Sequence, residues 1–321
     1  MALYKLRMAK DDLSSGILER AKHEDVDYEK YFEDWLENSP DALLDEEGTV
    51  LWIGRQVKAN VGDTGKYPDL LGVDSVGDVI IVELKKGKAP RDVIAQILEY
   101  ATWASSLDSN QLNEIAVNYF SLQDRGYESF PQAHKEVFYP DSEEEPNVKF
   151  NENQKLFIIA EEIPSIIRQV TAYLRNKHHI NIFCIEYEIL KSEQGEYFIS
   201  TEKIGVFEDI GPTTTRWNEP VRVKTVIYEA VNRVTNGRND SVFSPTDVYK
   251  ELIKTYPDIN RSSVSGQIIQ DCVNHSSRKH YPSGQQDFYF RIDKGKFRLY
   301  DSSKDGKWDS KGEKIENLET G

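Results

Sequence analysis

The sequence predicts an α/β fold, with a central mixed sheet flanked by helices, followed by a smaller domain of helices and a hairpin. Up to residue 204, β-prone runs alternate with segments of helical spacing, as in α/β domains. The Pro- and Thr-rich stretch GPTTTRWNEP then interrupts this pattern and indicates a linker. The predicted division is a first domain at 1–210, a linker at 211–220, a second domain at 221–300 and a polar tail at 301–321.

The first domain begins with a predicted helix at 24–38, EDVDYEKYFEDWLEN, which Pro40 ends. Three strands follow, with Gly77 at the tip of the turn between the last two. Pro90 then precedes an amphipathic helix. The segment 108–150 is less regular, and a strand, a helix and two strands complete the domain. In order, the elements after the first helix are expected at 50–57, 67–73, 79–85, 91–107, 155–163, 164–177, 180–190 and 196–204.

The second domain reads as helices followed by a hairpin. Ser244 is a plausible N-cap, with Pro245 at the first helical position of the middle helix. Alternating aromatic residues at 287–300 flank a turn at Gly295 and predict the hairpin. Helices are expected at 221–235, 244–257 and 260–276. Three helices followed by a two-stranded wing is the order of a winged-helix domain.

Charge is distributed unevenly along the 321 residues. The net charge of −15 by itself argues against binding to nucleic acid, because a phosphate-binding surface must supply cations. Residues 221–300, however, carry 13 Lys and Arg against 8 Asp and Glu. A basic domain joined to an acidic one suits a protein that docks on nucleic acid, and the alternative is ordinary solvated charge.

The two cysteines, Cys184 and Cys272, are far apart and are expected to be isolated buried thiols rather than a disulfide or a metal pair. The histidines show no zinc spacing. No run approaches the roughly 18 apolar residues that span a bilayer, so we expect no membrane association. The start MALYKLRMAKDD lacks an apolar signal region, which favours a cytoplasmic location.

The stretch YPDLLGVDSVGDVIIVELKKG at 67–87 carries the chemistry. Asp69 lies on one predicted strand, and Glu83 and Lys85 project from the same face of the next. Two facing carboxylates repel each other, and a hard divalent cation such as Mg²⁺ or Mn²⁺ relieves that repulsion. Such a cation activates water and stabilises phosphate charge, with the lysine beside it. The alternative is a charged strand end in water, since the D…E-x-K pattern also arises by chance.

The chain resembles the PD-(D/E)XK nuclease superfamily and, within it, the DUF91/NucS-like endonuclease branch. The resemblance spans roughly residues 25–205 and rests on four blocks in order: FEDWLENSP, LWIGRQV, YPDLLGVDSVGDVIIVELKKGKAP and QILEYATWA. It implies a restriction-endonuclease-like core. The mismatch-specific branch carries its own N-terminal DNA-binding domain, for which residues 1–24 are too short, so mismatch specificity is in doubt.

The resemblance implies a role for individual residues of the first domain. It makes Asp69, Glu83 and Lys85 the catalytic set, with Glu33 of the first helix completing the metal site and Glu37 as a second candidate for that role. It also assigns Gln96 and Tyr100, four apart on one helix face, to the site or substrate, and Arg55 to a phosphate contact. For each of these there is a structural alternative: solvated charge for Glu33 and Glu37, a core aromatic for Tyr100, and an ion pair for Arg55.

In the second domain, 260–274 is the expected recognition helix. Its first residues and the cations after it and on the wing are expected to reach base edges and phosphates. The alternative is a winged-helix domain used for protein contact, with ordinary surface charge. The candidate DNA contacts are Arg261, Ser263, Gln267, Arg278, Lys279, Arg291, Lys294 and Lys296.

Taken together, the sequence predicts a Mg²⁺- or Mn²⁺-dependent endonuclease that hydrolyses phosphodiesters of double-stranded DNA. The expected setting is restriction or defence against foreign or modified DNA, by analogy with the family. A homodimer is expected, so that both strands are cut. The alternatives are a non-catalytic DNA-binding regulator that keeps the fold as a scaffold, a mismatch-type repair endonuclease, and an RNA-processing nuclease.

Overall fold

The computed structural model describes most of the chain, and from residue 31 onward it also describes the side chains. The described residues are 4–9, 12–20, 22–23, 29–44, 49–57, 68–140, 148–192, 194–204, 221–257, 259–282 and 285–315. The expected linker at 211–220 and residues 316–321 of the expected tail lie outside them. Among the described residues, no helix is both long enough and apolar enough to cross a membrane.

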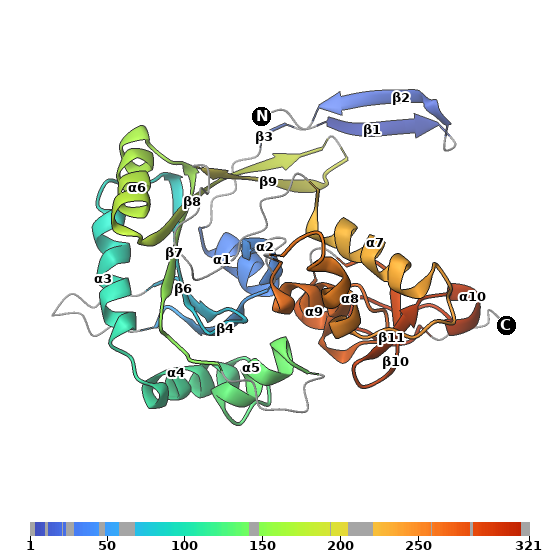
Figure 1. Ribbon diagram of the computed structural model, residues 1–321. Coiled ribbons are helices and arrows are strands. Elements are labelled where there is room, and N and C mark those ends of the chain that lie inside the picture. Colours follow the sequence, from blue (N-terminus) through green and yellow to red (C-terminus); the bar gives the residue numbers. More distant parts are fainter. Residues whose placement is uncertain are drawn as a thin grey trace.

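A mixed sheet forms the centre of the N-terminal domain (Figure 1). Within the described residues it has seven strands, in the order β3-β8-β7-β6-β5-β4, with β9 paired to β8. β6, β7 and β8 are parallel to one another, and the other pairs are antiparallel. The strands are β3 (Lys22–His23), β4 (Leu51–Arg55), β5 (Leu70–Val73), β6 (Val79–Lys88), β7 (Gln154–Glu162), β8 (Asn181–Lys191) and β9 (Tyr197–Ile204).

Helices cover both faces of this sheet, as Figure 1 shows. α3 packs on β6 and β7, and α6 packs on β8. α1 lies on the opposite face, where the Phe32 ring stacks on Tyr187 at 4.2 Å between centroids. These helices are α1 (Glu29–Asn38), α2 (Asp41–Leu44), α3 (Val93–Ser105) and α6 (Ser165–His178). The predicted fold class, an α/β domain with a central mixed sheet flanked by helices, is confirmed.

Burial explains why β6 occupies the middle of the sheet. Its first six residues, VIIVEL, are all buried, because helices cover a parallel strand on both faces and leave no side for water. Glu83 is the charged member of this run, and burying a carboxylate costs free energy unless partners stabilise it. The buried Glu83 therefore makes this end of the sheet a candidate for a functional site.

Residues 108–150, expected to be less regular, contain the helices α4 (Ser109–Leu122) and α5 (Phe130–Phe138). Asp108 caps α4 in a capping box with Gln111, and the Ser129 side chain caps α5. Both helices contact β4, at the edge of the sheet. A separate hairpin of β1 (Tyr4–Ala9) and β2 (Asp12–Arg20) precedes the sheet, and the sequence did not predict it.

The C-terminal domain has its own hydrophobic core, drawn from α7, α8, α9 and the hairpin β10–β11. Its elements are α7 (Val223–Thr235), α8 (Pro245–Leu252), α9 (Arg261–Gln270), the 3₁₀ helix η3 (Ser276–His280), β10 (Tyr289–Asp293), β11 (Lys296–Leu299) and α10 (Ser302–Asp305). Ser244 caps α8, with Pro245 at its first position, as the sequence predicts. As far as residue 315, the segment expected to be a tail packs on this domain through the ion pair of Arg298 with Asp305 and through the Trp308 ring against Phe290.

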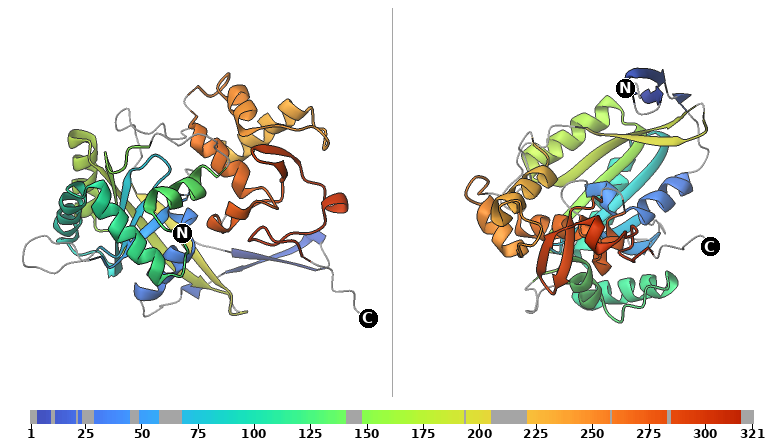
Figure 2. Two further views of the ribbon diagram at one scale, coloured as in Figure 1. Left: turned by 90° about the horizontal axis from the view of Figure 1, so that it is seen from below. Right: turned by 90° about the vertical axis from the view of Figure 1, so that its right-hand side faces the viewer.

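The two domains contact each other beside α5 and the β5–β6 turn. The left view of Figure 2 shows the green α5 next to the orange and red elements of the C-terminal domain. Ser75 in that turn lies 3.1 Å from the Ser262 hydroxyl in the first turn of α9. Thr49 Oγ1 donates a hydrogen bond of 2.9 Å to the His280 carbonyl. The Ser277 hydroxyl donates one of 3.2 Å to the Glu136 carbonyl. The start of α9, the expected recognition helix, therefore rests against the N-terminal domain.

Candidate active site

Asp69 and Glu83 come from neighbouring strands and lie opposite each other. Asp69 directly precedes β5, and the antiparallel pairing of Leu70 with Val82, continued by one residue, places Asp69 across from Glu83. Asp69 Oδ2 accepts a hydrogen bond of 2.6 Å from the Leu84 backbone N–H, which fixes this carboxylate against β6. Two acids that are distant in sequence are thus held together by the sheet.

Lys85 adds a positive charge on the face of β6 that carries Glu83. Residues two apart on a strand share a face, and the Lys85 ammonium forms an ion pair with Glu83 Oε1. Glu83 is only 1% exposed. The arrangement expected from the sequence, two acids and a lysine at one end of the β5–β6 hairpin, is therefore present.

The electrostatics of this corner centre on Asp69. Burial raises the pKa of the Asp69 carboxyl to about 8, and the negative charges of Glu83 and Glu33 act in the same direction. The Leu84 N–H and the positive charge of Lys85 oppose the rise. Asp69 is therefore held in an environment that disfavours its anion, which is a common property of functional carboxyl groups.

Gln96 and Tyr100, on α3, form the wall behind these acids. Gln96 Nε2 donates a hydrogen bond of 2.8 Å to the Tyr100 hydroxyl. The pKa of the Tyr100 phenol is raised, first by burial and then by the charges of Glu83 and Asp69, which shows that the ring lies near them. Since Tyr100 is 1% exposed, its place is in the wall rather than on a surface open to DNA.

Glu33 approaches the same corner from α1, where Arg55 holds it. Arg55 Nη2 lies 3.0 Å and Nε 3.2 Å from Glu33 Oε2. Arg55 Nη1 lies 2.5 Å from Asp34 Oδ1 and 2.8 Å from Glu37 Oε2. Glu33 is 4% exposed, and its charge raises the pKa of Asp69. Glu33 therefore lies near enough to influence Asp69 electrostatically, and Arg55 is the centre of an ion-pair cluster.

The donor chemistry of this corner suits a hard divalent cation. Glu33, Asp69 and Glu83 supply carboxylate oxygens, which Mg²⁺ and Mn²⁺ prefer. Within the described part of the chain, no three His, Cys, Asp or Glu side chains are already grouped to hold a metal ion. Mg²⁺ typically binds one or two protein carboxylates, and water and substrate phosphate supply its other ligands. The Asp69–Glu83 pair by itself provides that number of carboxylates.

Sequence reasoning missed three polar residues beside these acids. Gln56 Nε2 lies 3.4 Å from Glu33 Oε2, and the Gln56 backbone is in the left-handed region, with φ of 48°. Asp34 pairs with Arg55, and the Tyr119 hydroxyl donates to Glu37. The signal that was available for Gln56 was its place in the GRQ block, directly after Arg55. Asp34 and Tyr119 carry no comparable signal, because only the packing of α1 and α4 brings them to Arg55.

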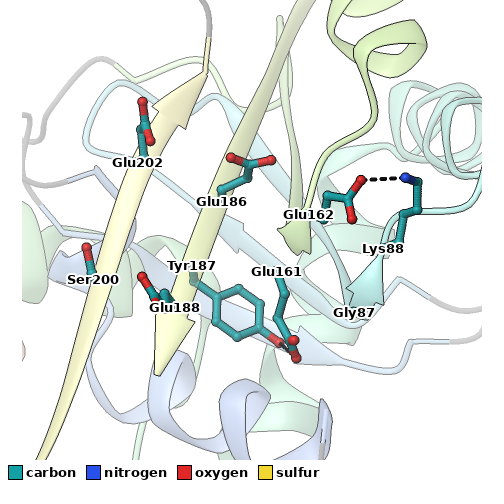
Figure 3. Close-up of a pocket in the computed structure, with 9 residues that line it drawn as sticks. All are labelled: Gly87, Lys88, Glu161, Glu162, Glu186, Tyr187, Glu188, Ser200 and Glu202. Carbon is teal, nitrogen blue, oxygen red and sulfur yellow. Dashed lines mark hydrogen bonds and ion pairs between the residues drawn. The ribbon is translucent and has the colours of Figure 1, made fainter. Parts of the chain in front are cut away.

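An acidic cavity of about 430 Å³ opens just past Lys85, where β6 ends (Figure 3). Lys88 on β6 pairs with Glu162 on β7, while carboxylates from β8 and β9 line the other side. Its lining is Gly87, Lys88, Glu161, Glu162, Glu186, Tyr187, Glu188, Ser200 and Glu202. Five glutamates against one lysine repel a phosphate backbone, so this cavity is not where DNA would bind.

The candidate DNA contacts of the C-terminal domain fall into two groups. Gln267 and Arg278 are buried, and they bond to Asp271 at 2.8 Å and to Asp287 at 2.6 Å. This placement removes both from the surface that a duplex can reach. Ser263 on α9 and Arg291 on β10 are half-buried. The exposed candidates are Arg261, Lys279, Lys294 and Lys296.

Comparisons with known proteins match parts of the chain. A family described as a domain of unknown function (DUF7669) matches residues 222–299. No curated protein matches the chain. Two similar solved structures are a repair endonuclease from Pyrococcus abyssi (12% identity, TM-score 0.26) and EndoMS in complex with double-stranded DNA (14% identity, TM-score 0.27). The matches cover 55% and 58% of this chain and 62% and 65% of those chains, and at these TM-scores they carry no functional argument.

Proposed function

We propose that this protein is a divalent-metal-dependent endonuclease that hydrolyses phosphodiester bonds of DNA. The observation that supports this best is the buried corner where Asp69 and Glu83 face each other beside Lys85. Glu83 is buried and Asp69 is half-buried, and holding their like charges face to face away from water costs free energy. A cation between them and a phosphate in front of them would offset that cost.

The chemistry can be assigned to individual side chains. When bound, a divalent cation lowers the pKa of a water molecule and neutralises charge on the scissile phosphate. Asp69 and Glu83 would hold the cation, and Glu33 would complete the set from α1. Lys85 would hold the attacking water or a phosphate oxygen. Water adds to phosphorus, one P–O ester bond breaks, and the departing deoxyribose oxygen takes a proton.

The C-terminal domain would dock the substrate. Its order of helices and hairpin is that of a winged-helix domain, and Arg261, Lys279, Lys294 and Lys296 present exposed cations. Because the start of α9 rests on the N-terminal domain, the wing is better placed than α9 to meet phosphates. We further propose restriction or defence against foreign or modified DNA as the setting, and a homodimer as the form that cuts both strands.

The test is cleavage of plasmid DNA, modified and unmodified, with Mg²⁺ or Mn²⁺. Lys85→Ala should lose roughly 10²–10⁴-fold in rate, the range for a positioned proton-transfer group. Lys88→Ala is the control, because it removes an exposed lysine further along β6 that pairs with Glu162 on β7, and it should cut like the wild type. Equal cleavage by both variants would mean that the site is wrong.

The same experiment separates the rival function, a DNA-binding regulator without catalysis. In that case the wild type would bind duplex DNA and leave it intact under every metal condition. A difference in rate between the two plasmids would instead point to restriction that depends on base modification.

A further inference from the structure

Arg55 and Gln56 lie between α1 and the Asp69–Glu83 pair, and both donate to Glu33. The bonds from Arg55 Nε, Arg55 Nη2 and Gln56 Nε2 all end on the same oxygen, Glu33 Oε2. Several donors on one carboxylate oxygen fix the orientation of the whole Glu33 carboxylate. Side chains that hold metal ligands in this way commonly set the affinity of the metal site.

The far side of the Arg55 guanidinium is anchored independently. Its Nη1 contacts Asp34 and Glu37, and Glu37 in turn accepts hydrogen bonds from the Tyr119 hydroxyl and, at 3.3 Å, from Gln123 Nε2. The guanidinium is thus fixed by α1 and α4 together. This anchoring makes it a rigid support for Glu33.

This geometry argues against the phosphate contact that the sequence suggested for Arg55. Three carboxylates surround one guanidinium, so the cluster is negative as a whole and repels phosphate. The Arg55 side chain is only 20% exposed, and a phosphate would have to displace an existing carboxylate partner. Arg55 therefore acts on the acids of this protein rather than on DNA.

Gln56 connects Glu33 to Asp69 through its backbone. Its N–H donates a hydrogen bond of 3.1 Å to the Asp69 carbonyl, while its side-chain amide reaches Glu33. The left-handed backbone at this residue, with φ of 48°, is unfavourable for a side chain other than glycine. A strained residue that bonds to two candidate metal ligands is typical of a functional position.

From these contacts we infer that Arg55 and Gln56 are positioning residues for Glu33 and tune the affinity of the cation site. The inference rests on the proposed function, because it takes Asp69, Glu83 and Glu33 as the cation ligands. Arg55 aims the carboxylate from α1, and Gln56 ties that carboxylate to the strand end that carries Asp69.

The test is a titration of Mn²⁺ into the DNA-free full-length protein, with free Mn²⁺ followed by electron paramagnetic resonance. Arg55→Lys removes the fork that holds Oε2, and should weaken Mn²⁺ binding by roughly 10–100-fold. Gln56→Ala should weaken it by several-fold. Glu33→Gln should cause a loss of its own, and adding Arg55→Lys to it should cause no further loss, because both changes act through Glu33.

Arg298→Lys is the matched control. Arg298 is also 20% exposed and also pairs with a buried carboxylate, Asp305, but it lies in the C-terminal domain. It should lower the melting temperature and leave Mn²⁺ affinity unchanged. If Arg55→Lys fails to fold, Gln56→Ala carries the test alone, and wild-type affinity in that variant would overturn the inference.

Other outcomes separate this inference from the proposed function. Suppose the wild type binds Mn²⁺, Asp69→Asn does not, and the Arg55 and Gln56 variants bind like the wild type. Then only the positioning role is lost. Unchanged Mn²⁺ affinity in Arg55→Lys, with a salt slope of DNA binding in Ca²⁺ lowered by about one, would restore Arg55 as a phosphate contact. Absence of Mn²⁺ binding by the wild type would overturn the cation site and the inference together.

Discussion

The two ends of the β5–β6 hairpin contain the same chemical groups and use them differently. Each end gathers two carboxylates and a lysine from neighbouring strands. One end holds Asp69, Glu83 and Lys85, and the turn end holds Asp74, Asp78 and Lys155. The comparison shows how a structural cluster differs from a candidate site within a single hairpin.

At the turn end, the protein itself satisfies the charges. Lys155 Nζ lies 2.6 Å from Asp74 Oδ2 and 3.6 Å from Asp78 Oδ2. The other oxygen of Asp74 accepts hydrogen bonds from the Val76 and Asp78 backbone N–H groups, each 3.0 Å long. Asn153 donates to Asp78 at 3.2 Å. This cluster fixes the turn, and through Ser75 it supports the contact with α9.

At the site end, a third carboxylate adds to the repulsion between the first two. Glu33 and Glu83 both raise the pKa of Asp69, in addition to the effect of burial, and Lys85 offsets only part of this. Burial and the charge of Asp74 also raise the pKa of Asp78 at the turn end. The two ends therefore differ in that Glu33, from α1, adds a third negative charge at the site end, where a cation from solvent would offset the repulsion.

The largest expected difference between the two ends is in catalysis. Asp69→Asn should reduce DNA cleavage by roughly 10³-fold, since it removes a cation ligand worth several kcal/mol of charge stabilisation. Asp78→Asn makes the same chemical change at the turn end and should leave the cleavage rate of folded protein within about threefold, less than 1 kcal/mol. Plasmid cleavage rates at saturating Mg²⁺ measure both. Equal losses would show that the turn cluster also takes part in the reaction.

Stability should show the reverse order. Lys155→Met leaves two buried carboxylates without their ammonium, and should lower the free energy of unfolding by about 3–5 kcal/mol, as for other broken buried ion pairs. Lys85→Met should cost less, because the Lys85 side chain is 22% exposed and water can replace part of its interaction, whereas the Lys155 side chain is 11% exposed. Urea unfolding of both variants without divalent metal tests the order. A larger loss for Lys85→Met would mean that the site end, too, is a structural cluster.

The pH dependence of stability should also differ. The pKa of Asp69 is about 8 in the folded protein and near 3.8 in the unfolded chain, so the folded state binds the proton more tightly. The resulting stability is fully present below pH 3.8 and is lost as the pH rises through about 8. Between pH 6 and 9, the metal-free protein should lose on the order of 1 kcal/mol or more, since one pKa unit is about 1.4 kcal/mol.

Asp69→Asn should remove most of this loss, and saturating Mg²⁺ should offset it in the wild type. Thermal unfolding across this pH range, with and without the cation, checks both expectations. A wild-type profile identical to that of Asp69→Asn would contradict the raised pKa.

The sequence predicted the backbone of this site better than its side-chain partners. Strand periodicity and the turn at Gly77 were sufficient to place Asp69 opposite Glu83, because a short hairpin fixes register. Helical spacing likewise placed Gln96 beside Tyr100. The sequence did not reveal that Arg55 bonds to three acids of α1, since that contact depends on how α1 packs on the sheet. The GRQ sequence is equally compatible with an arginine that contacts a phosphate and with one that pairs with carboxylates.

In the C-terminal domain, too, the sequence predicted the elements better than the partners of individual side chains. Its helices and hairpin follow from caps and alternation, but Arg278 and Gln267 face inward. Sequence alone also gave no sign that the start of α9 touches the N-terminal domain at Ser75. Contacts between distant segments decide which cations remain available, and periodicity does not report them.

The smallest predicted effect concerns the exposed cations, and it tests whether the C-terminal domain complements the acidic corner by binding phosphate. Lys296→Glu and Arg261→Glu should each weaken duplex binding and lower the slope of log affinity against log salt by about one, as for one lost phosphate contact. Arg238→Glu is the control, because this exposed arginine already pairs with Asp240 and is not among the candidate DNA contacts.

Binding measured in Ca²⁺ at several salt concentrations gives the slopes. If Arg261→Glu leaves the slope unchanged while Lys296→Glu lowers it, the wing alone meets DNA. That result would agree with the docking of α9 on Ser75. If neither variant changes the slope, the basic C-terminal domain binds a partner other than DNA, and the candidate active site binds its substrate without that domain.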